Sequence, residues 1–267
     1  MTTHMPEQLK ACCAAAYGND IVALLLGDSY HPGGRALTRR LADGLGLRAG
    51  AQVLDVAGGP GATARLLAEQ YHVCVDGIDL SPATVDRARR LTERAGLSDR
   101  VRFHVGDAER LPFPDGRFDS VICECAFCTF PDKPTAAGEF ARVLRPGGRV
   151  GMADVTVRAG RLPPELAGLA GWVACLADAR PLDEYAALMT AAGLRVVQTE
   201  RHDLALQSMI DQVAARLALL QIMQADRISA AGIDLDTALG YARLAATSVA
   251  AGDIGYAVLI ADKPGPG

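Results

Sequence analysis

Glycines and carboxylates of this chain are spaced as in a pocket for a nucleotide-type cofactor. The apolar segment 53–56 contains Asp55 and runs directly into a turn of sequence Ala-Gly-Gly-Pro-Gly at 57–61. Only a backbone without Cβ turns this sharply and approaches a ligand closely. A second carboxylate, Asp79, follows about twenty residues beyond the turn, the separation at which an acid meets a ribose diol. A third, Asp107, follows the next apolar segment.

Cysteines form a second group of side chains that could do chemistry. The chain contains seven, and Cys123, Cys125 and Cys128 lie close together in the sequence, with Cys175 further along. Alternate residues of a strand share a face, so Cys123 and Cys125 are expected to point the same way about 7 Å apart, with Cys128 folding back from the following loop. Thiolates are soft ligands that suit soft metals and metalloids. Cysteine is also among the most buried residue types, so each thiol has a purely structural alternative.

Apolar strands and helices alternate along the chain and must position these groups. The expected strands are residues 53–56, 73–80, 101–105 and 118–123, a fifth fed by 144–150, and two late ones at 194–199 and 254–261. Strands that alternate with helices indicate a doubly wound α/β sheet, which binds its ligands at the carboxyl ends of the strands.

The length of 267 residues suits a single α/β domain that carries extra helices. We expect residues 1–49 to form a helical cap, 50–204 the cofactor-binding core, 205–250 a helical insertion rich in alanine and leucine, and 251–262 the last strand. No internal repeat or flexible linker interrupts this plan.

Charge and targeting signals narrow the class of protein. The net charge is −4 with acids and bases scattered along the chain, which argues against nucleic acid as the main partner. The first residues lack the pattern of a secretion signal, and no apolar run approaches the roughly eighteen residues that span a bilayer. We therefore expect a cytoplasmic enzyme with cysteines kept as thiols and no membrane partner.

This order of motifs resembles the class I S-adenosylmethionine-dependent methyltransferases over about residues 50–200. The resemblance implies a Rossmann-like sheet, mostly parallel with an antiparallel last strand, and S-adenosylmethionine as the cofactor. It assigns the turn to the methionine part, Asp79 to the ribose hydroxyls, and Asp107 to the adenine. The full set of implied cofactor contacts is Asp55, Ala57, Gly59, Gly61, Asp79, Leu80, Asp107, Ala108 and Cys123.

The turn itself distinguishes this family from its nearest competitor. Ala57 stands where the family more often has glycine, which tightens the turn without forbidding it. A dehydrogenase is the competing interpretation, but its phosphate-binding turn prefers G-x-G-x-x-G, which residues 57–62 do not supply.

The cysteines resemble those of the arsenite methyltransferases in particular. Cys125 stands six residues before a Pro-Asp-Lys at 131–133, and Cys175 precedes a Leu-x-Glu-Tyr helix at 182–185, as in that family. The resemblance implies that Cys125 and Cys175 hold a trivalent arsenical, such as arsenite or methylarsenite delivered by glutathione, and that these cysteines with Cys128 are the catalytic set.

A third cysteine of that family, shortly after the glycine turn, has no match in residues 63–70. Cys128, Cys123 or the Cys12-Cys13 pair would have to replace it. Thiolate-bound arsenic keeps a lone pair free to attack the methyl group, so catalysis would rest on positioning, which can supply roughly 7–11 kcal/mol. No general base is needed, and Glu124 is a candidate for a polar wall near the sulfonium.

Other interpretations of the same residues stay open. If the cysteines only pack, the scaffold resembles the ubiquinone and menaquinone branch, and the acceptor is a small organic molecule with an O-, N- or C-nucleophile. Tyr30, His31 or His202 would then be the acid–base residue. A non-catalytic protein that sequesters a soft metal is the third possibility. A structural zinc site fits poorly, because Cys-x-Cys-x-x-Cys lacks the paired Cys-x-x-Cys spacing. A catalytic cysteine nucleophile also fits poorly, because no histidine lies near these cysteines in the sequence.

Overall fold

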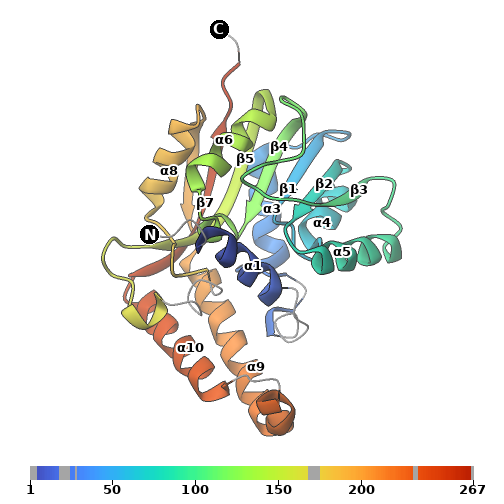
Figure 1. Ribbon diagram of the computed structural model, residues 1–267. Helices are drawn as coiled ribbons and strands as arrows, with labels where there is room; N and C mark the ends of the chain where they lie inside the picture. The colour runs from blue at the N-terminus through green and yellow to red at the C-terminus, as the bar shows by residue number, and fades with distance from the viewer. Residues whose placement is uncertain (1–4, 18–24, 28, 168–174, 231–233, 266–267) are drawn as a thin grey trace.

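A seven-stranded sheet runs through the computed structural model (Figure 1). The strands are, in chain order, β1 (Gln52–Val56), β2 (Cys74–Asp79), β3 (Val101–Val105), β4 (Phe118–Glu124), β5 (Leu144–Val157), β6 (Arg195–Arg201) and β7 (Ile254–Asp262). The structure describes residues 5–17, 25–27, 29–167, 175–230 and 234–265.

The sheet has the strand order β3-β2-β1-β4-β5-β7-β6. Strands β1 to β5 pair in parallel, whereas β7 is antiparallel to both of its neighbours, β5 and β6. The chain winds outward from β1 in one direction and then from β4 in the other, so a crevice opens between the carboxyl ends of these two strands. The expected doubly wound sheet with an antiparallel last strand is confirmed.

Helices cover both faces of the sheet. They are α1 (Met5–Tyr17), α3 (Gly34–Leu45), α4 (Ala62–Tyr71), α5 (Pro82–Arg94), α6 (Lys133–Val143), α8 (Leu182–Ala191), α9 (Asp203–Ala230) and α10 (Leu235–Ala250), with short 3₁₀ turns at Phe127–Thr129 and Pro164–Leu166. One apolar cluster joins the sheet to α3, α4 and α5, and a second joins the opposite face to α6 and α8. Burial on both faces explains why the central strands are almost continuously apolar.

Local signals fix where the helices near the cavity begin. Ser81 caps α5 by accepting a hydrogen bond from the Thr84 N–H at 3.3 Å. Asp132 caps α6 in the same way through the Thr135 N–H at 3.0 Å. Both helices have proline in their first turn, where its missing N–H costs nothing. The preceding strand ends are therefore held at the carboxyl edge of the sheet.

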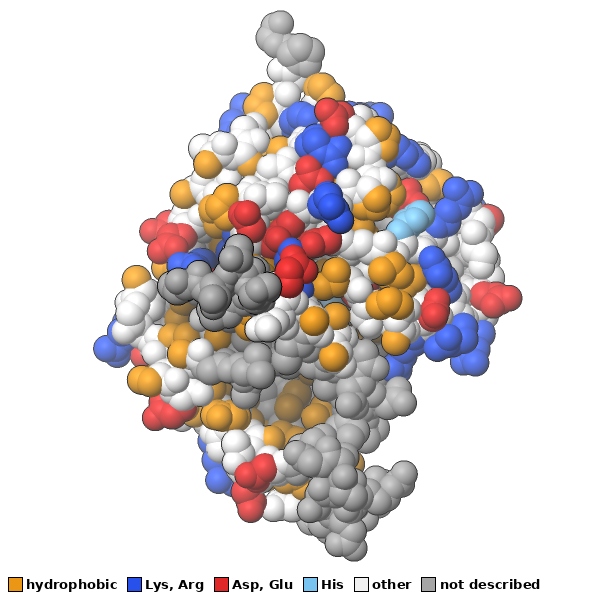
Figure 2. All heavy atoms as spheres, in the orientation of Figure 1, with side chains coloured by type: hydrophobic (Ala, Val, Ile, Leu, Met, Phe, Trp, Pro, Cys, Tyr) orange, Lys and Arg blue, Asp and Glu red, His pale blue; other side chains and the backbone are white. Residues whose placement is uncertain are grey.

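The segments outside the central pattern take different positions. Of residues 1–49, α1 crosses the carboxyl edge of the sheet while α3 packs against β5 and β7 (Figure 1). The expected insertion consists of α9 and α10, which pack against each other and extend beyond the sheet. Among the described residues, no helix combines the length and the apolar character needed to cross a membrane. On the face drawn in Figure 2, acidic and basic side chains are interspersed.

Candidate active site

The glycine-rich turn carries the chain from β1 into α4 at the carboxyl edge of the sheet. Gly58 has no room for a side chain, because a Cβ there would lie 2.8 Å from Oδ2 of Asp55. Gly61 precedes α4 with φ 78°, and a Cβ there would collide with the ring of Phe103. Ala57 lies in the same left-handed region with φ 55°, which costs a residue with a Cβ roughly 1–2 kcal/mol. The turn therefore brings the backbone close to the crevice, and the conformation of Ala57 costs conformational free energy.

Asp55 presents a buried carboxylate with an unused acceptor to this crevice. The residue is 2% exposed, and its Oδ2 has no hydrogen-bond partner within the described part of the chain. Burial, and then the neighbouring charge of Glu124, raises the pKa of Asp55 well above its usual value. A buried acceptor without a partner costs about 1–3 kcal/mol. The site is thus suited to a ligand group that donates hydrogen bonds or carries positive charge.

Asp79, at the end of β2, is held in one orientation by two backbone donors. The Gly59 N–H donates to its Oδ2 at 3.1 Å, and the Ser81 N–H donates to its Oδ1 at 2.9 Å. Burial raises the pKa of Asp79, although these two hydrogen bonds oppose the shift. The next residue, Leu80, lines the same cavity. The glycine turn and the carboxylate of Asp79 are therefore held together by hydrogen bonds.

Asp107, after β3, is tied to the N-terminal helix. Lys10 of α1 donates to Oδ2 of Asp107 at 2.8 Å and also pairs with Glu109. Burial alone would lower the pKa of Lys10, but the hydrogen bonds to the two carboxylates raise it above its usual value. Ala108 lines the cavity beside them. These ion pairs fix α1 over this end of the cavity.

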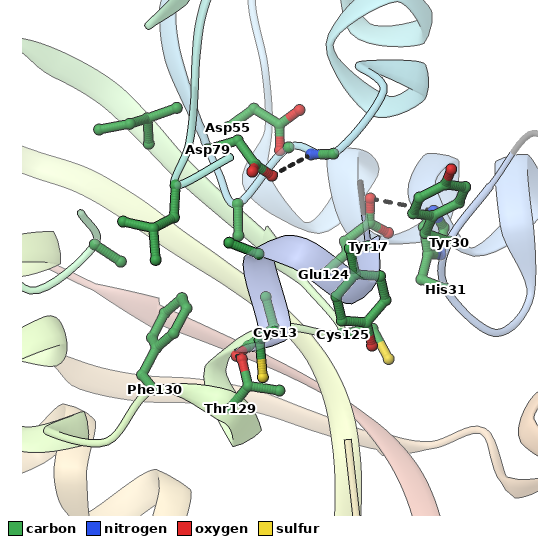
Figure 3. A pocket seen from close by; sticks show the side chains of 18 of the residues that line it. Cys13, Tyr17, Tyr30, His31, Asp55, Asp79, Glu124, Cys125, Thr129 and Phe130 are labelled. Carbon is green, nitrogen blue, oxygen red and sulfur yellow. Dashed lines mark hydrogen bonds and ion pairs between the residues drawn. The ribbon is translucent and has the colours of Figure 1, made fainter. Parts of the chain in front are cut away.

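The carboxylates of Asp55, Asp79 and Asp107 and the turn residues up to Pro60 border one cavity (Figure 3), whereas Gly61, expected from the sequence to contact the cofactor, is not part of its lining. In Figure 3 the carboxylates of Asp55 and Asp79 lie at the top, with Tyr17 and Tyr30 on one side of the cavity and Phe130 on the other. The rings of Tyr17 and Tyr30 are 6.3 Å apart between centroids, and Phe130 lines the wall formed by the segment after β4. The lining of the cavity therefore combines buried carboxylates with aromatic rings.

Glu124, the last residue of β4, is the centre of a buried polar group on the cavity wall. Its carboxylate accepts hydrogen bonds from the hydroxyls of Thr63, at 2.6 Å, and Thr38, at 3.2 Å. Nε2 of His31 lies 3.6 Å from the same carboxylate, as Figure 3 shows. The side chains of Glu124 and His31 are only 4% and 7% exposed. A buried acid and imidazole thus face the cavity next to the cofactor-type carboxylates.

Three thiols lie close together beside Tyr17. They belong to Cys125, Cys128 and Cys175 and are called the thiol cluster. The Cys175 thiol donates a hydrogen bond to the Cys125 carbonyl oxygen at 3.3 Å, and its sulfur lies 3.1 Å from the Tyr17 hydroxyl. Hydrogen bonds from the Cys125 and Cys128 thiols, joined by one from Tyr17, outweigh burial and lower the pKa of Cys175 well below its usual value. The bond with Cys175, followed by burial, raises the pKa of Cys125. Cys175 is therefore the most readily ionised thiol of the cluster.

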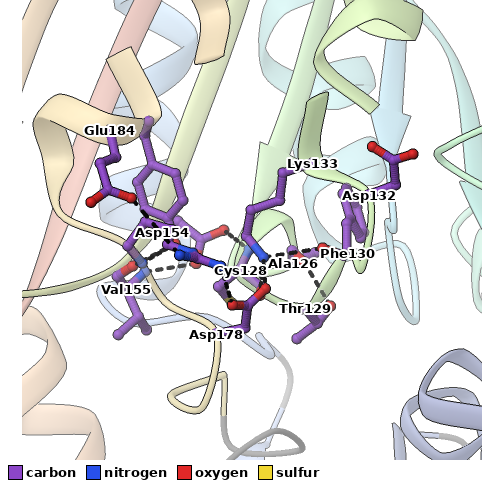
Figure 4. Close-up of polar contacts among 12 residues, drawn as sticks. Ala126, Cys128, Thr129, Phe130, Asp132, Lys133, Asp154, Val155, Asp178 and Glu184 are labelled. Atoms are coloured by element: carbon purple, nitrogen blue, oxygen red, sulfur yellow. Dashed lines mark hydrogen bonds and ion pairs between the residues drawn. The ribbon is translucent and has the colours of Figure 1, made fainter. Parts of the chain in front are cut away.

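Lys133 holds the two cysteine-bearing segments together (Figure 4). Its ammonium donates to the carbonyl oxygens of Cys128, at 2.8 Å, and Phe130, at 3.0 Å. It also pairs with Asp178 at 2.5 Å, three residues after Cys175. Since Lys133 is only 4% exposed, this pairing is shielded from water. The Pro-Asp-Lys segment thus has a structural task of its own.

Asp154 of β5 supports the thiol cluster from the sheet. Its Oδ2 accepts a hydrogen bond from the Cys128 N–H at 3.1 Å (Figure 4). Burial, and then the charge of Cys175, raises the pKa of Asp154 to about 7. The sheet therefore holds a buried carboxyl group of raised pKa against the backbone of Cys128.

Some residues singled out from the sequence lie elsewhere. Cys123 is fully buried and does not line the cavity; it packs with the apolar layer of α6 and α8, whereas Cys125 packs with the opposite layer. The expected common orientation of these two cysteines is wrong, because β4 ends at Glu124 and Cys125 takes φ 52°. His202 contacts Glu200 at 3.2 Å and is not part of the cavity lining.

The two N-terminal cysteines, Cys12 and Cys13, differ in what the structure shows of them. Cys13 lines the cavity, whereas the side chain of Cys12 lies outside the described residues. Within the ranges that the structure describes, no group of three or more His, Cys, Asp or Glu side chains is arranged to hold a metal ion. The thiol cluster is therefore not a preformed metal site.

Several residues of the site carried no local signal in the sequence. Lys10 and Tyr17 reach partners 97 and 158 positions away, and the two threonines on Glu124 come from separate helices. The positive charge of Lys10, the single basic residue of α1, is the one hint that could have been noticed. The rest depends on how the elements pack.

The family can be identified from known proteins. A family model described as "Methyltransferase domain" matches residues 53–148. Methyltransferase GfsG of Streptomyces halstedii is 34% identical over 197 residues, which cover 67% of this chain and 70% of that protein. The 27-O-demethylrifamycin SV methyltransferase of Amycolatopsis mediterranei is 34% identical over 239 residues, covering 85% and 83%.

A solved structure supports the same fold. The cyclopropane synthase MmaA2 from Mycobacterium tuberculosis matches with a TM-score of 0.80 at 17% identity, over 95% of this chain and 98% of that one. The match of the fold and the similarity to the two relatives over more than two thirds of their length agree. The chain therefore belongs to the class I S-adenosylmethionine-dependent methyltransferases, and S-adenosylmethionine is its cofactor.

Proposed function

We propose that the enzyme methylates an oxygen nucleophile of a small organic acceptor that binds in the aromatic part of the cavity. The observation that carries this proposal is the buried pair of His31 and Glu124, which faces the cavity beside the cofactor-type carboxylates. A hydroxyl acceptor must lose a proton when it is methylated, and a positioned side chain that takes this proton typically contributes 10²–10⁴-fold to the rate.

The residues present fit the cofactor. The unpaired Oδ2 of Asp55 suits the positively charged ammonium of the methionine part. Asp79, fixed by two backbone N–H groups, is assigned to the ribose hydroxyls. Asp107 and Ala108 are assigned to the adenine, with Leu80 along the same wall. When bound, the cofactor supplies an electrophilic methyl group on a sulfonium.

His31 is assigned as the proton acceptor. Its Nδ1 lies 3.2 Å from the Pro32 carbonyl oxygen and its Nε2 lies 3.3 Å from the Thr38 hydroxyl, and these two contacts orient the ring. The imidazolium that forms would be stabilised by the carboxylate of Glu124 at 3.6 Å. Thr38 and Thr63 keep this carboxylate in place.

The acceptor class is supported by the relatives and by the lining. One relative that is similar over 85% of this chain is named for methylation of an oxygen of rifamycin SV, an organic molecule. Tyr17, Tyr30 and Phe130 offer rings on which a planar acceptor can pack. His202, a further candidate base from the sequence, is outside the lining.

The test is a screen of phenols and hydroxylated polyketides with methyl-deuterated S-adenosylmethionine, read by mass spectrometry. We expect transfer to at least one hydroxyl acceptor. His31→Asn should lower kcat at least about 100-fold and leave the cofactor Kd nearly unchanged, whereas the matched variant His202→Asn should behave as wild type. Full activity of His31→Asn would exclude the assigned base.

A second candidate acceptor is a trivalent arsenical, and the convergence of Cys125, Cys128 and Cys175 favours it. Soft thiolates suit this element, and Cys175 is the thiol of the cluster whose pKa is lowered. Binding through three sulfurs would require the cluster to rearrange, since it is not a preformed metal site. Binding of a methylated arsenical through two thiolates, those of Cys125 and Cys175, would require less rearrangement of the cluster than binding through three.

This candidate is tested with arsenite or methylarsenite, glutathione and S-adenosylmethionine, followed by chromatography with arsenic-specific detection. Methylated products that disappear in Cys125→Ser and Cys175→Ser, with cofactor binding retained, would support arsenic as the acceptor. Absence of such products from the wild-type enzyme would leave the organic acceptor.

A further inference from the structure

The thiol cluster has features that methylation of an organic acceptor does not use. Cys125 and Cys175 are two of four described residues other than glycine with positive φ, at 52° and 62°. Such strained conformations persist only where the surrounding structure enforces them, and they concentrate at functional sites. Here the enforcement is visible, because Lys133 and Asp178 tie the two cysteine segments together.

The cluster is also connected to the helix that covers the cavity. Helix α1 is fixed at one end by Lys10, through Asp107 and Glu109. At the other end the Tyr17 hydroxyl contacts the Cys175 sulfur at 3.1 Å. Burial raises the pKa of Tyr17, so its hydroxyl keeps its proton and is able to donate it to the sulfur. The cover of the cavity therefore depends on the chemical state of Cys175.

We propose that Cys125 and Cys175 are a modification site that forms a reversible disulfide under oxidation by a peroxide, and that this disulfide loosens α1 from the cofactor cavity. The proposal goes beyond the methylation reaction and does not depend on the identity of the acceptor. Cys125 lines the cavity, so a small oxidant can reach the cluster by the same path as the substrates.

The reaction balances with hydrogen peroxide as the oxidant. The Cys175 thiolate attacks one peroxide oxygen, the O–O bond breaks, and Cys175 becomes a sulfenic acid while hydroxide leaves. The Cys125 sulfur then attacks the Cys175 sulfur, the S–O bond breaks, and the S–S bond forms. The Cys125 proton and the departing oxygen end in water. Two thiols are oxidised by two electrons, and one peroxide is reduced to two waters.

Cys125 is the partner for geometric reasons. The Cys175 thiol donates to the carbonyl oxygen of Cys125 itself at 3.3 Å, so the two residues are in direct contact. Cys128 also touches Cys175, but it is 1% exposed and its backbone is bonded to Asp154. Moving Cys128 would break that hydrogen bond, whereas Cys125 borders open cavity.

The effect on α1 follows from the loss of one strong acceptor. A thiolate accepts a hydrogen bond well, and a disulfide sulfur does so weakly. The Tyr17 hydroxyl would lose the Cys175 sulfur as a strong acceptor, and the contact between α1 and the thiol cluster would weaken. We expect oxidation to raise the Kd for S-adenosylmethionine about three- to tenfold, the factor that corresponds to one net hydrogen bond.

The test treats the full-length enzyme with hydrogen peroxide and maps disulfides by mass spectrometry of peptides, with calorimetric titration of S-adenosylmethionine in parallel. We expect a Cys125–Cys175 link, a weaker cofactor affinity, and recovery of both with dithiothreitol. Cys125→Ser and Cys175→Ser should form no such link. Cys74→Ser, outside the cluster, is the matched control and should respond as wild type.

Tyr17→Phe tests the coupling separately from the disulfide. The reduced Tyr17→Phe enzyme should bind S-adenosylmethionine as weakly as oxidised wild type, and oxidation should change it no further. The proposal is overturned if peroxide links Cys128 in place of Cys125, if no link forms, or if the linked enzyme keeps its cofactor affinity. Neither readout uses methyl transfer, so failure of the proposed acceptor would remain distinguishable.

Discussion

Individual residues at the cavity carry costs that a purely structural role would not explain. Ala57 and Cys125 have positive φ on opposite sides of the crevice, and Asp55 buries an acceptor without a partner among the described residues. Each feature lowers the free energy of unfolding of the protein without ligand. Costs of this kind are tolerated where a ligand recovers them on binding.

Asp55→Asn separates stability from cofactor binding. The raised pKa of Asp55 means that its ionised form is disfavoured in the folded protein, so this group stabilises at low pH and loses that contribution as pH rises. At neutral pH the neutral amide should therefore raise the free energy of unfolding of the apo-enzyme, by about 1 kcal/mol. Loss of the negative charge should weaken S-adenosylmethionine binding at least about tenfold.

Urea unfolding of the apo-enzyme and calorimetric titration measure the two effects. The control is Asp99→Asn. Asp99 is exposed, and its Oδ2 lies 3.8 Å from Nε of Arg100, so this variant is expected to change neither the free energy of unfolding nor the affinity for S-adenosylmethionine. If Asp55→Asn lost stability and retained its affinity, Asp55 would be a packing residue.

At the scale of elements, the N-terminal helix is the piece whose position the function depends on. Helix α1 contributes Lys10, Cys13, Ala14 and Tyr17 to the lining of the cavity. Its fixed points lie on the loop after β3 and on the thiol cluster. The sheet and its glycine turn can thus form without α1, whereas the closed cavity cannot.

Lys10→Met should release one end of α1. The ion pairs of Lys10 are largely shielded, with Lys10 and Glu109 at 11% and 12% side-chain exposure, so their loss should matter more than that of a surface pair. We expect the Kd for S-adenosylmethionine to rise several-fold and amide hydrogen exchange within residues 5–17 to accelerate. Unchanged exchange in α1 would contradict this role.

The control is Arg35→Met on α3, which removes an exposed pair with Glu69 at 3.6 Å. Such surface pairs contribute about 0–1 kcal/mol. Exchange in α1 and cofactor affinity should therefore stay at wild-type values in this variant.

For the whole molecule, buried carboxylates make stability depend on pH in an unusual direction. Burial is the leading cause of a raised pKa at Asp55, Asp79 and Asp154. The folded state therefore binds protons that the unfolded state has released. The free energy of unfolding contributed by these groups falls as pH rises through the window between the unfolded and folded pKa values.

Asp154→Asn should remove one part of this dependence. For Asp154 the window runs from the ordinary 3.8 to about 7, and the full effect is at most about 4 kcal/mol. Urea unfolding between pH 4.5 and 8, roughly the range of this window, should give a flatter pH dependence for the variant. Equal slopes for both proteins would show that Asp154 does not titrate there.

The sequence alone determined the parts of the protein that follow from local patterns. Apolar runs of strand length, the turn after β1 and the positions of Asp79 and Asp107 led to the doubly wound sheet, the cofactor and the methyltransferase family. These features arise because side chains alternate along a strand and because a sharp turn requires glycine. Both constraints act within a few residues of one another.

The tertiary structure decided what depends on packing between distant segments. It brought Cys125, Cys128 and Cys175 together while placing Cys123 in the opposite apolar layer. It also placed Tyr17 on Cys175 across 158 positions. The strand alternation that seemed to pair Cys123 with Cys125 ended one residue too early, at Glu124. Contacts over such distances are set by the relative positions of whole elements, which no local pattern records.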